Sequence, residues 1–285
     1  MQHPPDNHDR GLAFDLATML ERRRALKLLA GLGLVALVGC GGDDETAAGD
    51  TTTTSGGSSS TSATSASGTG STSGANCTEI PGETAGPYPG DGSNGPNILS
   101  QSGIVRSDIR SSIGSASGVA EGVPLAINLA VLDAGKSCAA LAGAAVYLWH
   151  CDREGRYSMY SEGAADENYL RGVQQTDADG KVTFQSIFPA AYSGRWPHIH
   201  FEIYPSLDKA TSAAGKMATS QLAFPADVCQ LVYATTGYSA SVRNLAQTSL
   251  ERDMVFSDGA TSQLATCAGD TNNGYTAELA VRVTA

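Results

Sequence analysis

Basic side chains are few in this chain of 285 residues, which carries 18 lysines and arginines against 29 aspartates and glutamates. The resulting formal net charge is −11 at pH 7, and nucleic-acid binding needs clustered cations, so nucleic acid is excluded as the expected partner. Aromatic residues are also scarce, at 6% of the chain. Residues 51–76 contain 22 Ser, Thr or Gly among 26 positions, so this tract lacks the apolar area that folding requires. One folded domain is therefore expected within residues 77–285.

The apolar run at 28–38 has only 11 residues, which is too short to span a bilayer as a helix. Basic residues at 22–24 precede it, and paired arginines there resemble a twin-arginine export signal. The run ends in Leu37-Val-Gly-Cys40, which resembles a bacterial lipobox. We expect a signal peptide over 1–39, lipidation of Cys40, a disordered tether over 40–76, and a periplasmic or cell-surface lipoprotein anchored to the membrane. An ordinary secretory signal is the alternative.

Cysteine is sparse, and no two cysteines stand in a C-x-x-C spacing, so a zinc site built on cysteine is not expected. An exported protein is expected to contain disulfides. Five cysteines are left once Cys40 is set aside, so at least one thiol is free or paired between chains. These five are Cys77, Cys138, Cys151, Cys229 and Cys267.

Short segments of alternating apolar and polar residues predict β-strands after residue 123. Turn residues such as those at 133–135 and 177–180 separate these segments. The only helical candidate is 230–250. The predicted strands are 124–132, 144–150, 181–187, 198–204 and 276–283. The sequence therefore predicts a mostly β fold, a sandwich or barrel with long functional loops.

Histidine is rare as well, and two of the five histidines are His198 and His200. On a strand they point to the same face, about 7 Å apart along the chain, and imidazole is a frequent metal ligand. The bland interpretation is two surface histidines beside a core Ile199. Glu202 continues the same strand face, which leaves a carboxylate as a further candidate ligand.

Tyrosines supply another type of oxygen donor near these histidines. Tyr192 lies just upstream, and Tyr157 stands in the segment Gly155-Arg-Tyr-Ser158. Two phenolates with two imidazoles would favour Fe(III), because anionic ligands stabilise the higher oxidation state. Taken one at a time, each tyrosine is more often a core or surface packing residue than a ligand.

Four motifs that follow one another along the chain favour the ligand interpretation. They are Trp149–Tyr160, Arg171–Gly180, Phe184–Tyr192 and Arg195–Phe201. Their succession resembles the intradiol ring-cleavage dioxygenases, and the protocatechuate 3,4-dioxygenase branch most of all. A fifth segment, Thr84-Ala-Gly-Pro-Tyr88, resembles the substrate-pocket motif of that family.

The resemblance implies a β-sandwich of the intradiol dioxygenase type that holds a non-haem Fe(III). It implies that Arg195 stabilises charge developing on the bound ring and that Tyr192 leaves the metal to accept a substrate proton. Carried over position by position, the metal ligands are Tyr157, Tyr192, His198 and His200. The residues implied to bind substrate are Pro87, Tyr88, Trp149 and Gln221.

The activity implied is cleavage by O2 of a small aromatic diol, of the protocatechuate, catechol or hydroxyquinol class, to a cis,cis-muconate. A different class of function also stays open. The same kind of sandwich serves in transthyretin-like and carbohydrate-binding modules, where the two histidines would be surface residues on a non-catalytic lipoprotein. The sequence leaves monomer and homodimer both open.

Overall fold

The computed structural model describes residues 77–285. The predicted signal segment 1–39, the lipidation site Cys40 and the tether 40–76 lie outside the described residues. Within residues 77–285, no helix has the length and apolar character needed to cross a membrane.

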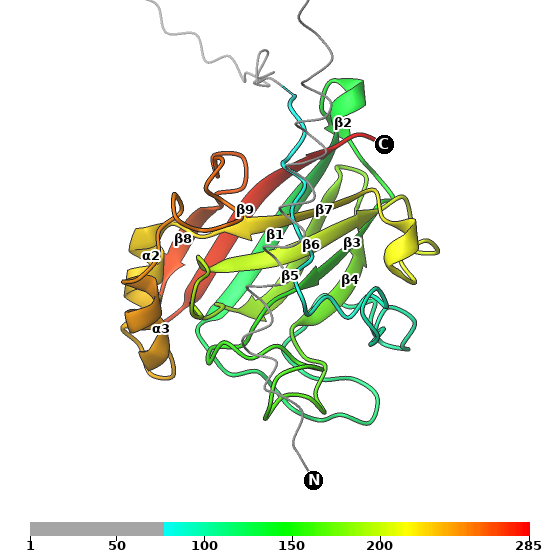
Figure 1. Ribbon diagram of the computed structural model, residues 1–285. Coiled ribbons are helices and arrows are strands. Elements are labelled where there is room, and N and C mark those ends of the chain that lie inside the picture. Colours follow the sequence, from blue (N-terminus) through cyan, green and yellow to red (C-terminus); the bar gives the residue numbers. More distant parts are fainter. Residues whose placement is uncertain (1–76) are drawn as a thin grey trace, which may run out of the picture. The chain divides into compact units, whose positions relative to one another are not determined.

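Two β-sheets and two short helices make up the domain (Figure 1). One sheet has the order β2-β1-β9-β8, and β5 also pairs with β1; the other has the order β4-β3-β6-β7. The helices are α2 (Ala226–Tyr233) and α3 (Ser239–Leu245), and two 3-10 turns, η2 and η3, cover Ala134–Lys136 and Ala213–Gly215. The strands are β1 (Pro124–Asp133), β2 (Ala139–Ala140), β3 (Ala145–Trp149), β4 (Arg171–Gln175), β5 (Lys181–Ile187), β6 (His198–Tyr204), β7 (Ala218–Ala223), β8 (Thr266–Asp270) and β9 (Gly274–Val283).

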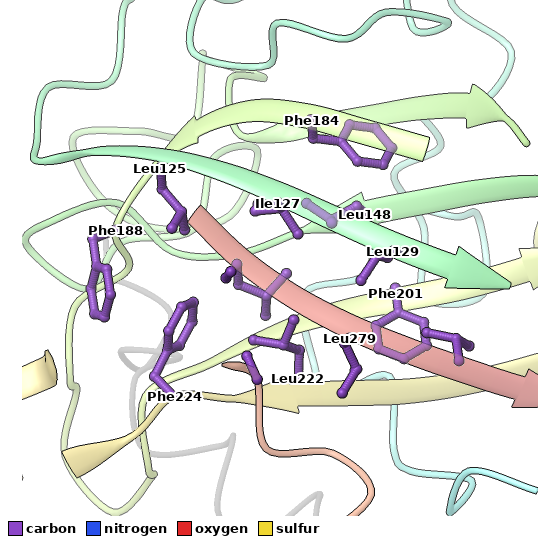
Figure 2. Packing of buried hydrophobic residues seen from close by; sticks show 14 of the residues in the cluster. Leu125, Ile127, Leu129, Leu148, Phe184, Phe188, Phe201, Leu222, Phe224 and Leu279 are labelled. Atoms are coloured by element: carbon purple, nitrogen blue, oxygen red, sulfur yellow. The ribbon is translucent and has the colours of Figure 1, made fainter. Parts of the chain in front are cut away.

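The main core lies between the two sheets, and the period-two pattern of the strands explains it. Every second residue of β1, from Leu125 to Val131, is buried, while the residues between them are partly exposed. Leu148 and Phe201 meet this row from the opposite sheet (Figure 2). Alternation puts one face of β1 in the core and the other toward solvent. The mostly β sandwich predicted from the sequence is confirmed.

Strand β6 differs from β1, because all seven of its residues are buried. Its odd-numbered residues, such as Ile199 and Phe201, belong to the core between the sheets. Its even-numbered residues, including His198 and His200, therefore point to the outer face of the four-stranded sheet. Loops cover that outer face, where a second cluster of buried side chains contains Trp149 and Tyr157. The predicted ligands thus lie beneath loops.

The C-terminal strand β9 pairs in parallel with β1 over residues 275–283, which makes it an integral part of the sheet. The strands predicted over 124–132, 144–150, 181–187, 198–204 and 276–283 are all present, within two residues at each end. Strands β2, β4, β7 and β8 were missed, because segments such as Arg171–Gln175 are polar or small and show no apolar alternation. The predicted helix 230–250 is wrong in extent: two short helices occupy the region, separated at Gly237, whose φ is +96°.

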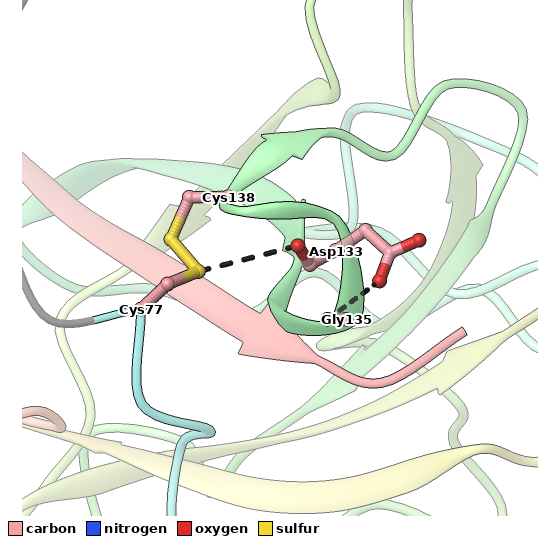
Figure 3. Close-up of a disulfide and its surroundings, with 4 residues drawn as sticks. All are labelled: Cys77, Asp133, Gly135 and Cys138. Carbon is pink, nitrogen blue, oxygen red and sulfur yellow. Dashed lines mark hydrogen bonds between the residues drawn. A yellow bond between two sulfur atoms is a disulfide. The ribbon is translucent and has the colours of Figure 1, made fainter.

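A disulfide joins Cys77, at the start of the domain, to Cys138 beside the turn at Asp133–Gly135 (Figure 3). Gly135 N donates a hydrogen bond of 2.9 Å to the Asp133 carboxylate, which caps this turn. The other cysteines of the described residues are free: Cys151 and Cys229 are buried and Cys267 is partly buried. Within this chain, three of the five cysteines of the described residues are therefore free thiols.

Candidate functional site

The four predicted metal ligands meet at one point on the outer face of the four-stranded sheet. His198 and His200 extend from β6, Tyr157 from the loop after β3, and Tyr192 from the loop after β5. Nε2 of His198 lies 3.1 Å from Nε2 of His200, 3.1 Å from the Tyr192 hydroxyl and 3.5 Å from the Tyr157 hydroxyl. The two hydroxyls are 3.4 Å apart. Residues from three separate segments thus place two phenol oxygens and two imidazole nitrogens together.

The spacing of these donor atoms fits a shared metal ion. Ligand atoms about 2.1 Å from one ion and at right angles to each other lie about 3.0 Å apart, close to the separations found here. Nδ1 of His198 is 2.5 Å from the Trp196 carbonyl oxygen, to which it donates. A neutral His198 then carries its lone pair on Nε2, which faces the other three donors.

The phenols are needed for any metal site here. Among residues 77–285, no group of three or more His, Cys, Asp or Glu side chains is placed to hold a metal ion. The carboxylate alternative is wrong, because Glu202 accepts hydrogen bonds from Lys216 Nζ at 2.6 Å and from the Tyr204 hydroxyl at 2.7 Å. Its carboxylate is therefore already paired with a partly buried lysine.

Burial dominates the electrostatics of the metal-free cluster. It raises the pKa of Tyr157 well above its usual value, and the neighbouring Tyr192 adds to the effect. Burial also lowers the pKa of His198 well below its usual value, assisted by the positive charge of Arg195. The pKa of His200 is lowered for the same first reason. All of these groups are neutral until a cation arrives, and a highly charged ion would favour the phenolates.

Arg195 stands beside the cluster, with Nη1 3.5 Å from Nε2 of His198. Its Nε donates to the Asp253 carboxylate at 2.9 Å, and its Nη2 donates to Oε1 of Gln221 at 2.7 Å. Gln221 in turn donates to the Thr84 carbonyl at 2.9 Å. Both side chains of the ion pair are buried, so the guanidinium has a fixed orientation.

Asp253 was not singled out from the sequence. It lies in an irregular stretch, Glu251-Arg-Asp-Met254, where charged residues of both signs alternate as on an ordinary solvated surface. Only its complete burial reveals it. No local pattern could have paired it with Arg195, 58 residues earlier.

A hollow opens beside the cluster. Pro87 and Tyr88, both predicted to bind substrate, line it, and the Tyr88 ring lies 5.1 Å from that of Tyr157. Gly86 has a φ of +68°, and a Cβ there would approach Cε1 of His200 to 3.5 Å, so the chain passes close over the imidazole. The complete lining is Ala85, Gly86, Pro87, Tyr88, Tyr157, Tyr192, Arg195 and His200.

The two other predicted substrate-binding residues lie behind the hollow and do not line it. Trp149 is fully buried, and its ring stacks on His200 with centroids 4.9 Å apart and planes 7° apart. Gln221 contacts Arg195, as described above. In this structure Trp149 therefore supports a predicted ligand from behind, and Gln221 orients a lining residue.

Comparisons with known proteins identify the family of the chain. A family model described as "Dioxygenase" matches residues 95–260, more than half of the chain. The structure is similar to that of an intradiol ring-cleavage dioxygenase from Tetranychus urticae, with 26% sequence identity, a TM-score of 0.52, and coverage of 64% of this chain and 87% of that one. Catechol 1,2-dioxygenase 2 of Acinetobacter lwoffii is 37% identical over 59 residues, so the match spans about a fifth of each chain. The chain belongs to the intradiol ring-cleavage dioxygenase family.

Proposed function

We propose that this protein is an Fe(III)-dependent enzyme that uses O2 to cleave a catechol-type diol between its two hydroxylated carbons. The observation that carries the proposal is the convergence of two phenols and two imidazoles beside a buried arginine and an open hollow. The catechol 1,2-dioxygenase relative supports the reaction class. Tyr157, Tyr192, His198 and His200 would hold the iron.

Within the diol class, the lining of the hollow favours an uncharged ring. Among residues 77–285, Arg195 is the only cationic side chain that lines it, and its guanidinium already contacts Asp253 and Gln221. A ring carboxylate, as in protocatechuate, would find no second cation among the lining residues to pair with. We therefore propose catechol, or a catechol with uncharged substituents, as the preferred substrate.

When bound, ferric iron supplies a Lewis acid that draws electron density from the diol oxygens. The chain's own residues do the rest. The Tyr192 oxygen, on the less buried of the two tyrosines, accepts one substrate proton. Arg195 lines the hollow with a positive charge of fixed orientation, which would stabilise negative charge that develops on a ring bound there. Both atoms of O2 enter the product, the bond between the hydroxylated carbons breaks, and a cis,cis-muconate dicarboxylate results.

The test is a visible absorption spectrum, an iron determination and an oxygen-uptake assay with catechol. We expect a broad tyrosinate-to-iron band that shifts when catechol is added without O2. Tyr157→Phe and His200→Ala should lose iron or the band and at least 90% of activity. Tyr275→Phe, which removes a hydroxyl from a tyrosine packed near Phe188 in the main core, is the matched control and should keep both. Retention of iron and activity by both site variants would overturn the ligand assignment.

We also propose that the protein is exported and anchored through a lipid on Cys40. The arginines at 22–24, the short apolar run at 28–38 and the Leu37–Cys40 segment support this. Metabolic labelling with a radioactive fatty acid tests it: wild type should be labelled and Cys40→Ala should not. Labelling of both would show that Cys40 is not the lipidated residue.

The protein is either a monomer or a homodimer, and sedimentation velocity distinguishes the two states.

A further inference from the structure

Arg171 is fully buried, yet it is neither a predicted metal ligand nor a residue that lines the hollow. It opens strand β4 and pairs with Trp149 on β3, which pairs with His200 on β6. Directly paired residues of antiparallel strands share a face of the sheet. Arg171, Trp149 and His200 therefore form a row across the outer face, with the predicted metal ligand at one end and the arginine at the other.

The guanidinium of Arg171 makes five hydrogen bonds, as many as it has N–H groups. None goes to a carboxylate, and within residues 77–285 Arg171 takes part in no ion pair. Nε donates to Ser158 Oγ at 3.0 Å, Nη1 to the Pro89 carbonyl at 2.8 Å and the Tyr147 hydroxyl at 3.0 Å, and Nη2 to the carbonyls of Tyr88 and Ser158, both at 2.9 Å. A buried charge is costly unless it is hydrogen-bonded, and this set compensates it with neutral oxygens alone.

These oxygens come from two sides of the hollow. Tyr88 lines it and Pro89 is the next residue in the chain, while Ser158 directly follows the predicted ligand Tyr157. The Tyr147 hydroxyl strengthens the connection, because it accepts from Arg171 and donates to the Pro89 carbonyl at 2.6 Å. One side chain thus joins the backbone of the substrate-binding segment to the backbone beside a metal ligand.

The close approach restricts the neighbouring sequence as well. Gly90 has a φ of +66°, and a Cβ there would come within 2.8 Å of Nη1 of Arg171. Gly90 N donates a hydrogen bond of 2.8 Å to the Tyr160 hydroxyl. The Tyr160 ring lies under the guanidinium, 5.4 Å from Cζ to the ring centroid. The segment is therefore held against the arginine from both sides.

We propose that Arg171 is a positioning residue that sets the distance between the segment Gly86–Pro89 and the loop of Tyr157, and thereby the width of the diol-binding hollow. This inference rests on the proposed function. Lysine keeps the positive charge but has three donors on one atom instead of a planar fork, so it cannot reach both sides at once. Arg171→Lys therefore isolates the geometry from the charge.

The experiment compares Arg171→Lys with Arg106→Lys. Arg106 is a matched control, because its guanidinium donates to the carbonyls of Arg171, at 3.0 and 2.6 Å, and of Asn168, at 3.3 Å, and it does not line the hollow. We expect Arg171→Lys to raise KM for catechol at least tenfold, with kcat changed less than threefold and iron content unchanged. Arg106→Lys should leave KM within twofold. Equal KM values in both variants would overturn the proposal.

Hydrogen exchange on the iron-free proteins supplies a readout that does not depend on activity. Arg171→Lys should accelerate amide exchange in peptides covering 86–92 and 157–161 at least tenfold over wild type, and Arg106→Lys should not. If wild type neither binds iron nor cleaves catechol, the proposed function fails, and this exchange pattern still decides whether Arg171 joins the two segments. Unchanged exchange in both peptides would refute the connection itself.

Discussion

The buried pair of Arg195 and Asp253 offers the sharpest test of how the site is held together. Asp253 accepts four hydrogen bonds while fully buried. One carboxylate oxygen accepts from Arg195 Nε at 2.9 Å and Trp196 N at 2.6 Å, and the other from Val255 N at 2.8 Å and Phe256 N at 3.2 Å. Asp253→Asn keeps the shape, but its amide nitrogen must face two N–H donors whichever way it is turned.

The magnitude follows from this arrangement. The variant removes the negative charge opposite a buried guanidinium and leaves two donors without an acceptor. Breaking a buried ion pair by neutralising one partner costs about 3–5 kcal/mol of folding free energy. With a urea m-value of about 2 kcal/mol/M, the unfolding midpoint should fall by about 1.5–2.5 M. Because Arg195 also loses its orientation, kcat/KM for catechol should fall at least tenfold.

Urea unfolding followed by circular dichroism measures the loss, and Asp108→Asn is the control. Asp108 also pairs with an arginine, at 2.7 Å from Arg110, but both side chains are about half exposed. An exposed pair contributes about 1 kcal/mol or less, so this control should move the midpoint by no more than about 0.5 M. If Asp253→Asn shifts the midpoint no further than Asp108→Asn, the buried pair contributes no more to the free energy of unfolding than an exposed pair does.

Two further predictions concern stability. His150 is buried, with Nδ1 2.7 Å from the Cys151 carbonyl and Nε2 2.7 Å from Ser186 Oγ, and burial lowers its pKa to about 4. Between pH 6.5 and 4 the unfolded chain therefore binds a proton at His150 that the folded domain does not. The free energy of unfolding of the iron-free domain should fall by about 2 kcal/mol from pH 7 to pH 5 through this group. Urea titrations at the two pH values should show a correspondingly smaller fall for His150→Gln. An equal pH dependence in both proteins would contradict this. The Cys77–Cys138 disulfide closes a loop with a sequence separation of 61, so its reduction should cost about 4 kcal/mol, which calorimetry with and without reductant measures. A loss below about 1 kcal/mol would show that the unfolded chain is not restricted in this way.

Local patterns were sufficient for much of the fold. Alternation of apolar residues predicted β1, β5, β6 and β9 within two residues, because one face of each strand must be buried and side chains alternate with period two. The same alternation placed His198 and His200 on one face. Strand β4 was missed, because Arg171–Gln175 is mostly polar although its first three residues are buried. The burial of Arg171 depends on the loops that cover the sheet.

The candidate ligands came from ordered motifs and their resemblance to a family. The approach of Tyr157 and Tyr192 to the histidine pair joins loops that are distant in sequence, yet the resemblance of the ordered motifs to the family implied it. The opposite holds for Trp149, which was expected to line the pocket and lies behind His200. A motif indicates that a residue is near a site, and it carries no information on which side of a ligand that residue packs.

The sequence by itself therefore determined the β-rich class, the acidic surface, and the identity of the residues that meet at the site. Tertiary structure alone decided the partners of the two buried arginines. Asp253 pairs with Arg195 across 58 residues, and the Tyr88 and Pro89 carbonyls meet Arg171 across more than 80. Such contacts depend on how loops close over the outer face of the sheet. Every residue has a backbone carbonyl, so the sequence does not indicate which carbonyls accept hydrogen bonds from a buried arginine, and only the folded structure shows it.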